Sequence, residues 1–268
     1  SAAAKNLTPV TLELGGKSPA IIAPGASMED AVERICFGKS LNAGQTCIAP
    51  DYILLPEGQE QTCIDTYQKT FARMYPSLRD NSDYTAIVNQ RQFGRLQSWV
   101  EDARQKGAKI TVVNPAAEDF SGTRKMPLHI IENGNADMKV LQEELFGPVL
   151  PVVPYKTLDS AIDYINDRDR PLALYLFSYD KAIQNTVLQR THAGGVSIND
   201  TLMHIAQDDM PFGGVGPSGM GHYHGKEGFI ALSKAKAVHR KGKFNSGQFI
   251  YPPYGNGIQK LIKKFFIR

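Results

Sequence analysis

The sequence has few of the residues that would indicate a disulfide framework or a structural metal site. It contains three cysteines, Cys36, Cys47 and Cys63, an odd number without a CxxC pair, and its six histidines show no ligand spacing. We therefore expect neither disulfides nor a metal. No apolar run approaches the roughly 18 residues that a membrane-spanning helix needs. The start also lacks a signal-peptide pattern, so we expect a cytoplasmic protein.

Acidic residues are missing from the last part of the chain. Residues 234–268 hold nine of the 30 Lys and Arg residues and none of the 27 Asp and Glu residues. The rest of the chain is therefore acidic overall, which argues against a nucleic-acid partner. Within this basic tail, one helical face would carry an apolar stripe formed by Ile258, Leu261, Ile262, Phe265 and Phe266. Such a helix could lie on an anionic membrane surface, but packing on its own enzyme or a sister subunit is the favoured interpretation.

Segments with strand character alternate with segments of helical character along most of the chain. "SPAIIAP", "DYILLP" and "VLPVV" are typical of buried strands, and Ser27 begins a capping-box pattern for a helix toward Asn42. "VTLEL" (residues 10–14) also resembles a buried strand. The alternation predicts an α/β fold with a mostly parallel sheet flanked by helices.

Glycine is concentrated in "PFGGVGPSGMG" (residues 211–221), which we expect to be a loop. It lacks the strand, GxGxxG and helix order of a dinucleotide site because Pro217 and Ser218 interrupt it. It is therefore not predicted to cradle phosphates.

Cys47 lies in "SLNAGQTCIAPDYILLP" (residues 40–56), between small polar residues and a predicted strand. A reactive cysteine needs partial exposure and surroundings that favour the thiolate. The compact neighbours would admit a substrate, and the Asn42 amide could donate to a developing oxyanion. Free cysteine is also among the most buried residue types, so a structural role is the default interpretation from these residues alone.

Two other acidic positions are of interest. Glu13 ends the apolar stretch "LELGG", where a desolvated carboxylate could act as a general base, although a solvent-facing Glu would also fit. Glu143 and Glu144 precede "LFGPV", and adjacent side chains point in different directions. We therefore expect at most one of them to face a ligand.

Four segments together resemble motifs of the aldehyde dehydrogenase superfamily. "LELGGKSP" is similar to its glutamate motif, "NAGQTCIAP" to its cysteine motif, "EELFGPV" to its nicotinamide-ribose motif and "PFGGVGPSGMG" to its late glycine-rich loop. They occur in the family's order along nearly the whole chain. "GQTCIAPDYILLP", "NDTLMHIA" and "PFGGVGPSGMGHYHGKEGF" resemble the class 3 and coniferyl aldehyde dehydrogenase branch.

The resemblance implies roles for individual residues. Cys47 would be the nucleophile and Glu13 the general base, while Glu144 would bind the nicotinamide ribose and Phe146 would hold the nicotinamide ring. Gly15 and Gly16 would let the cofactor pass close to the chain. The substrate tunnel would be bordered by Phe212, Ile48, His204 and Ile205. The implied reaction is oxidation of an aldehyde, such as aromatic coniferyl aldehyde, to its acid with NAD, or with NADP.

The resemblance covers only the C-terminal half of the family, which implies a piece of a longer enzyme. Residues 1–15 would then be the last part of a dinucleotide-binding domain, with most of that domain and its oxyanion-hole asparagine missing. Residues 16–232 would form the catalytic domain, and 233–268 an oligomerisation strand in "KAKAVHRKG" (residues 234–242) and the basic tail. A homodimer or tetramer is expected of the full enzyme. The alternatives are a cofactor-independent thiol esterase and a non-catalytic oligomerisation fragment.

Overall fold

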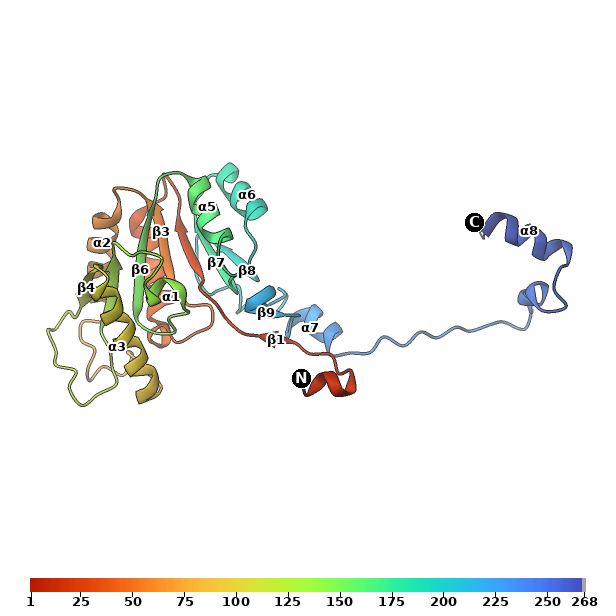
Figure 1. Ribbon diagram of the computed structural model, residues 1–268, viewed down its shortest axis with the longest axis horizontal. Helices are drawn as coiled ribbons and strands as arrows, with labels where there is room; N and C mark the ends of the chain where they lie inside the picture. The colour runs from red at the N-terminus through yellow and green to blue at the C-terminus, as the bar shows by residue number, and fades with distance from the viewer. Residues whose placement is uncertain (267–268) are drawn as a thin grey trace. The chain divides into compact units, whose positions relative to one another are not determined.

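The computed structural model describes residues 1–266, which form two compact units, Ser1–Leu232 and the segment from Ser233 onward. Each unit is described by itself. The first contains a seven-stranded sheet with helices on its faces (Figure 1). Across the described residues, no helix is long and apolar enough to span a membrane.

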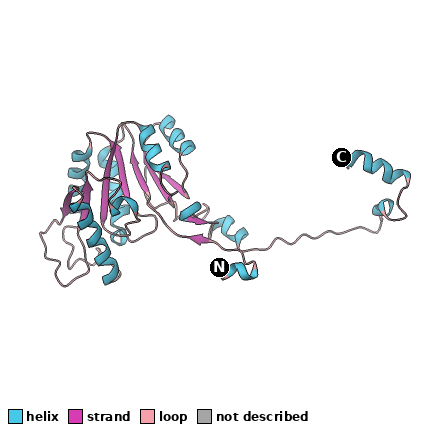
Figure 2. Ribbon diagram, in the orientation of Figure 1, coloured by secondary structure: helices cyan, strands magenta, loops and turns pink. Residues whose placement is uncertain are grey.

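The main sheet confirms the predicted mostly parallel α/β architecture (Figure 2). All neighbouring pairs of strands are parallel except β4 and β5. In their order across the sheet, the strands are β4 (Lys109–Val113), β5 (Leu128–Glu132), β6 (Val149–Tyr155), β3 (Tyr52–Pro56), β2 (Pro19–Ile22), β7 (Ala173–Phe177) and β8 (Gly195–Ile198).

The central strands bury side chains on both faces, as an apolar run in a parallel sheet predicts. In β2, Ala20 and Ile22 pack into one core cluster while Ile21 packs into another. The first face is covered by α1 (Met28–Ser40) and α2 (Glu60–Met74), and the second by α5 (Leu158–Asn166) and α6 (Lys181–Arg190). A third cluster joins α3 (Gln90–Gln105) and α4 (Lys139–Gln142) to β5 and β6.

Helix starts follow the predicted capping chemistry. The Ser27 hydroxyl accepts a hydrogen bond from the backbone N–H of Asp30 at 3.2 Å, which confirms the predicted start of α1. The helix ends at Ser40, and the 3-10 turn η2 (Leu41–Gly44) follows it. The chain thus changes direction just before Cys47.

The expectation that residues 10–14 form a buried strand is wrong. Only β1 (Leu12–Glu13) forms there, and it pairs antiparallel with β9 (Gly219–Met220) outside the main sheet. Both of its residues are exposed because no second layer of this chain covers them. The glycine-rich segment is therefore more than a loop, since it contains η3 (Gly216–Ser218) and β9 and is followed by α7 (Gly225–Ala231).

The remaining short elements lie near the two ends of the chain. The first unit begins with the 3-10 helix η1 (Ala3–Asn6), and the second holds η4 (Ser246–Ile250) and α8 (Gly257–Phe266). Helix α8 confirms the predicted helix and exposes Leu261 and Phe265; Ile267 and Arg268 lie outside the described residues. Residues 234–242, the predicted oligomerisation strand, form neither helix nor strand here. The roles assigned to residues 1–15, 16–232 and 233–268 stay predictions.

Candidate active site

Cys47 follows a left-handed turn that the sequence builds from Asn42, Ala43 and Gly44. Their φ angles are 52°, 52° and 73°, a conformation that costs about 1–3 kcal/mol for each residue other than glycine. A Cβ at Gly44 would lie 2.5 Å from the carbonyl oxygen of Gly147, so this position requires glycine for space as well. The turn therefore carries Cys47 close to the segment that contains Glu144.

Side-chain amides hold this turn in place. The Asn42 amide donates to the carbonyl of Gln45 at 3.1 Å, and the Gln45 amide donates to the carbonyls of Asn42 at 3.0 Å and Ala86 at 3.1 Å. The Gln45 side-chain oxygen accepts from the N–H of Val88 at 2.8 Å. One N–H of the Asn42 amide therefore stabilises the turn, and the hypothesis that this amide donates to an oxyanion stays a prediction.

Cys47 is the one half-buried cysteine among the three, since Cys36 and Cys63 are buried in α1 and α2. Burial, together with the hydrogen bond and the charge of the nearby Glu13 carboxylate, raises the pKa of the Cys47 thiol to about 12. The structure thus brings these two predicted catalytic residues together. In this state the Cys47 thiol holds its proton.

Glu13 is held beside Cys47 by the glycine-rich segment. Register pairs Glu13 with Gly219 and Leu12 with Met220, and the N–H of Leu14 donates to the carbonyl of Ser218 at 3.0 Å. A Cβ at Gly219 would stand 2.2 Å from the carbonyl oxygen of Leu12. The glycine is needed here so that two backbones can approach closely.

The Glu144 side chain lies against the backbone of the glycine pair. A Cβ at Gly15, where φ is +100°, would be 2.8 Å from Oε1 of Glu144. Burial raises the pKa of the Glu144 carboxyl to about 7, although a hydrogen bond from the Gly16 backbone opposes that shift. Glu143 is exposed and Glu144 is half-buried, and both border the same cleft, so the expectation that at most one of them faces a ligand stays a prediction.

These residues border an open cleft of about 630 Å³. Its lining includes Gly15, Gly16 and Glu144 together with Arg170 and Pro217. Phe146 is 40% exposed and has a φ of 50°, so an aromatic ring is presented to solvent two residues after Glu144. An exposed ring held by a rare backbone conformation is available to contact a flat ligand.

The four residues predicted to border a substrate tunnel are brought together in the core near Cys47. Ile48 and Phe212 are buried, Ile205 is partly buried, and all three belong to one cluster with Cys47. His204 is buried too, with ring centroids 5.7 Å from Phe212. Its Nδ1 lies 2.9 Å from the Ser197 hydroxyl, while its Nε2 has no hydrogen-bond partner. Their role in a tunnel stays a prediction.

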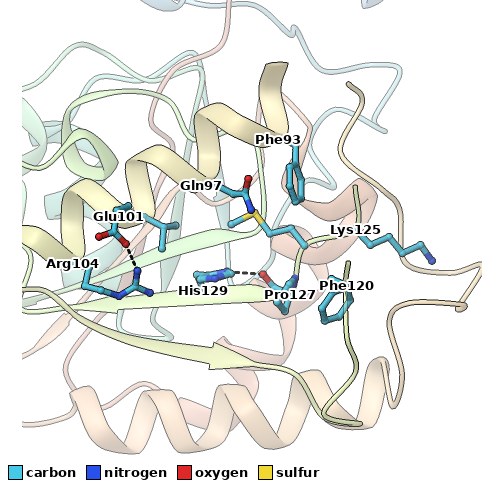
Figure 3. Close-up of a pocket in the computed structure, with 10 residues that line it drawn as sticks. Phe93, Gln97, Glu101, Arg104, Phe120, Lys125, Pro127 and His129 are labelled. Carbon is cyan, nitrogen blue, oxygen red and sulfur yellow. Dashed lines mark hydrogen bonds and ion pairs between the residues drawn. The ribbon is translucent and has the colours of Figure 1, made fainter. Parts of the chain in front are cut away.

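A different pocket, of about 440 Å³, lies between α3 and the hairpin of β4 and β5 (Figure 3). It is lined by Phe93, Phe120 and His129, among others, and Nδ1 of His129 lies 2.8 Å from the carbonyl oxygen of Pro127. None of its lining residues belongs to the four motifs. Despite its well-formed walls, it is therefore not the site where Cys47 and Glu144 meet.

The site lies at the amino ends of parallel strands. Lys17 lies two residues before β2, Cys47 precedes β3 and Glu144 precedes β6. Ligands in open α/β sheets usually bind beyond the carboxyl ends. The main sheet of this chain therefore presents Cys47 and its neighbours at the opposite end of the strands.

Residues 1–238 of the chain match the aldehyde dehydrogenase family. The chain belongs to this family. It is 59% identical over 267 residues to a Pseudomonas aeruginosa protein named "Probable coniferyl aldehyde dehydrogenase", covering 100% of this chain and 55% of that protein. It is 48% identical over 264 residues to the coniferyl aldehyde dehydrogenase of a Pseudomonas species, covering 97% of this chain and 55% of that protein.

Solved aldehyde dehydrogenase structures share the fold. The chain resembles substrate-bound AldH of Staphylococcus aureus with a TM-score of 0.88 and 42% identity, covering 99% of this chain and 57% of that one. It resembles a variant of Pseudomonas syringae AldC bound to NAD+ and octanal with a TM-score of 0.79 and 28% identity, covering 88% and 49%. The chain thus spans about half the length of the aldehyde dehydrogenases that it matches.

Sequence reasoning missed three charged residues of this aldehyde dehydrogenase site. Lys17, Asp51 and Arg95 all bind the backbone around Glu144. The available signal was a charged residue within two positions of the start of an apolar strand, as Lys17 and Asp51 are. Such residues are rarely buried unless they are paired.

The residues present fit the nicotinamide-ribose end of a dinucleotide. Gly15 leaves space that a Cβ would fill, Glu144 offers a carboxylate that can accept from hydroxyl groups, and Phe146 offers a ring face. These three would hold that end of NAD or NADP. A bound nicotinamide supplies a hydride acceptor, which no amino-acid side chain provides.

Proposed function

We propose that this chain is the nucleophile-bearing part of an enzyme that oxidises an aldehyde to a carboxylic acid with NAD or NADP. The observation that carries the proposal is the placement of Glu13 beside the Cys47 thiol, with Glu144 on the adjoining cleft. Family membership supports the reaction class. The other half of the cofactor site would come from sequence outside this chain.

The chemistry follows from the two residues. The Cys47 thiol gives its proton to solvent, and the thiolate sulfur attacks the aldehyde carbon to form the oxyanion of a thiohemiacetal. The Cys47 backbone N–H, which also acts to lower the thiol pKa, is positioned to donate to the developing oxyanion. A nicotinamide bound at the adjoining cleft would supply the hydride acceptor for this oxidation, and Cys47 would then hold the acyl group as a thioester.

Release of the acid needs water and a base. Glu13 is exposed on β1, so water can reach its carboxylate. The carboxylate takes a proton from water as the oxygen attacks the thioester carbon. The carbon–sulfur bond breaks, the carboxylic acid leaves, and the thiol regains a proton. Aldehyde, oxidised cofactor and water thus become acid, reduced cofactor and a proton.

The proposed substrate is an aromatic aldehyde such as coniferyl aldehyde. Two relatives that match nearly all of this chain carry that name. The nearby rings of Phe212, His204 and Tyr175 would suit an aromatic ligand, since such rings pack favourably on one another. We also propose that the full protein is oligomeric and cytoplasmic.

The test uses a hybrid protein. This chain replaces the matching 55% of the Pseudomonas aeruginosa relative, and formation of reduced cofactor from coniferyl aldehyde is followed at 340 nm. Activity in the hybrid, lost in its Cys47→Ser variant and retained in Cys63→Ser, supports the proposal. A folded hybrid that hydrolyses p-nitrophenyl acetate but reduces no NAD or NADP with any aldehyde would indicate a thiol esterase instead.

A further inference from the structure

Lys17 and Asp51 form an ion pair that joins the glutamate motif to the cysteine motif. Lys17 directly follows Gly16 before β2, and Asp51 lies four residues after Cys47 before β3. Their side chains are 12% and 3% exposed, and Nζ of Lys17 contacts Oδ1 of Asp51. A buried pair of this kind does little for stability by itself. The role of this ion pair therefore lies in its other contacts.

The remaining polar atoms of the pair bind one short backbone segment, residues 140–145. The Lys17 ammonium donates to the carbonyl oxygens of Val140 and Glu143, both at 2.9 Å. Oδ2 of Asp51 accepts from the backbone N–H of Leu145 at 2.8 Å. A lysine has three N–H donors, and here one faces Asp51 while two face this segment.

Arg95 of α3 binds the same segment from another element. Its Nη1 donates to the carbonyl oxygen of Glu144 at 3.2 Å, and its Nη2 donates to that of Leu145 at 2.6 Å. The guanidinium lies over the Trp99 ring at 4.1 Å and its Nε donates to Gln92 at 2.6 Å. The arginine is therefore itself fixed, and it binds two carbonyls of the segment that the Lys17–Asp51 pair does not bind.

Residues 143–145 have no regular structure of their own to hold them. Helix α4 is a single turn without a side-chain cap, and the chain stays irregular until β6 begins at Val149. Side chains therefore satisfy the backbone groups that a helix or a sheet would otherwise satisfy. The position of the Glu144 carboxylate beside Gly15 depends on these contacts.

We propose that Lys17 and Asp51 are positioning residues that fix the Val140–Leu145 segment, and with it Glu144, relative to Cys47. The proposal deepens the function proposed above, in which Glu144 binds the cofactor ribose. Three motifs that are distant in sequence meet through one ion pair. The pair would keep the cofactor-binding carboxylate and the nucleophile in one geometry.

The first test uses the 268-residue chain alone and needs no turnover. Hydrogen exchange followed by mass spectrometry is compared for wild type, Lys17→Met, Asp51→Asn and the control Lys109→Met, which removes a more exposed ion pair with Glu132. We expect exchange in residues 139–147 to quicken about tenfold in the first two variants, with other peptides within about twofold. Unchanged exchange in this segment, or a uniform rise across the chain, would overturn the proposal.

The second test uses the hybrid protein. Lys17→Met should raise KM for NAD by about tenfold while p-nitrophenyl acetate hydrolysis, which needs Cys47 but no cofactor, stays within about twofold. Lys17→Arg should restore part of the loss because its charge can still meet Asp51. An equal fall of both activities would indicate a merely structural role and contradict the proposal. A wild-type hybrid without dehydrogenase activity would count against the proposed function, whereas the exchange result still decides the positioning role.

Discussion

The carboxylate of Glu144 rests against Gly15, so closely that a Cβ at position 15 would lie 2.8 Å from Oε1. The two residues are far apart in sequence and meet at the edge of the open cleft. Gly15 also has a φ of +100°, which L side chains rarely adopt. Space and backbone conformation therefore both require glycine where the Glu144 carboxylate lies.

Gly15→Ala should displace Glu144 as well as strain the backbone. We expect a loss of about 1–3 kcal/mol in the free energy of unfolding, and a KM for NAD about tenfold higher in the hybrid protein. The matched control is Gly25→Ala, where φ is +79° but no atom lies within 4 Å of the added Cβ. The control variant should lose stability but keep the wild-type KM for NAD. Equal KM values for NAD in both variants would show that the contact between position 15 and Glu144 does not affect cofactor binding.

Glu13→Gln should make Cys47 react faster with iodoacetamide while it blocks turnover. The Glu13 carboxylate raises the pKa of the Cys47 thiol, so its removal lowers that pKa and enlarges the thiolate fraction. At pH 8 the alkylation rate should rise by about three- to tenfold, since one pKa unit corresponds to a factor of ten. Brief labelling and peptide mass spectrometry measure the rate. In wild type, Cys47 should label before the buried Cys36 and Cys63. A slower rate in Glu13→Gln would mean that the carboxylate activates the resting thiol.

Gly219→Ala should reproduce the labelling effect of Glu13→Gln although it changes neither Cys47 nor Glu13. The new Cβ would stand 2.2 Å from the carbonyl oxygen of Leu12, so β1 and β9 must separate. Glu13 would then leave the sulfur, and labelling of Cys47 should quicken by about threefold or more. Gly122→Ala, at a φ of +75° in open space, is the control and should label as wild type does. If Cys47 in Gly219→Ala labels at the wild-type rate, then β9 does not determine where Glu13 lies.

Stability should fall as pH rises through neutrality because of Glu144. Its pKa is raised from 4.5 to about 7, so the folded chain keeps this proton when the unfolded chain has lost it. The contribution is therefore complete below pH 4.5 and is lost as pH increases through 7. Between pH 5 and 8 we expect wild type to lose about 1–2 kcal/mol relative to Glu144→Gln, allowing for partial exposure. Urea unfolding of both proteins measures the difference, and parallel pH profiles would contradict the assigned pKa.

The sequence predicts the fold well where local pattern and tertiary packing agree. The run before Val32 has a capping serine, and the apolar strand around Ile21 is buried on both faces, so α1 and β2 form as expected. The apolar pattern of residues 10–14 failed for a physical reason. It predicts burial, but no layer of this chain covers β1, and Leu14 remains 60% exposed.

The residues of the site could be predicted from the sequence, but the contacts that hold them in place could not. Glu13, Cys47 and Glu144 stand in motifs, whereas the partners of Lys17 are backbone carbonyls more than 120 positions away. Carbonyls carry no sequence signal. For the same reason the contact of the Asn42 amide could not be predicted, because its partner is the carbonyl of Gln45 within a left-handed turn.

The most direct test of the central claim is to trap the thioester on Cys47. The hybrid protein carrying Glu13→Gln is mixed with coniferyl aldehyde and NAD, quenched in acid, and mapped by peptide mass spectrometry. Because the variant lacks the base that activates water, we predict one acyl group on the Cys47 peptide and about one equivalent of reduced cofactor per site. Reduced cofactor without acylation of Cys47, or continued turnover in the Cys47→Ser hybrid, would contradict the account.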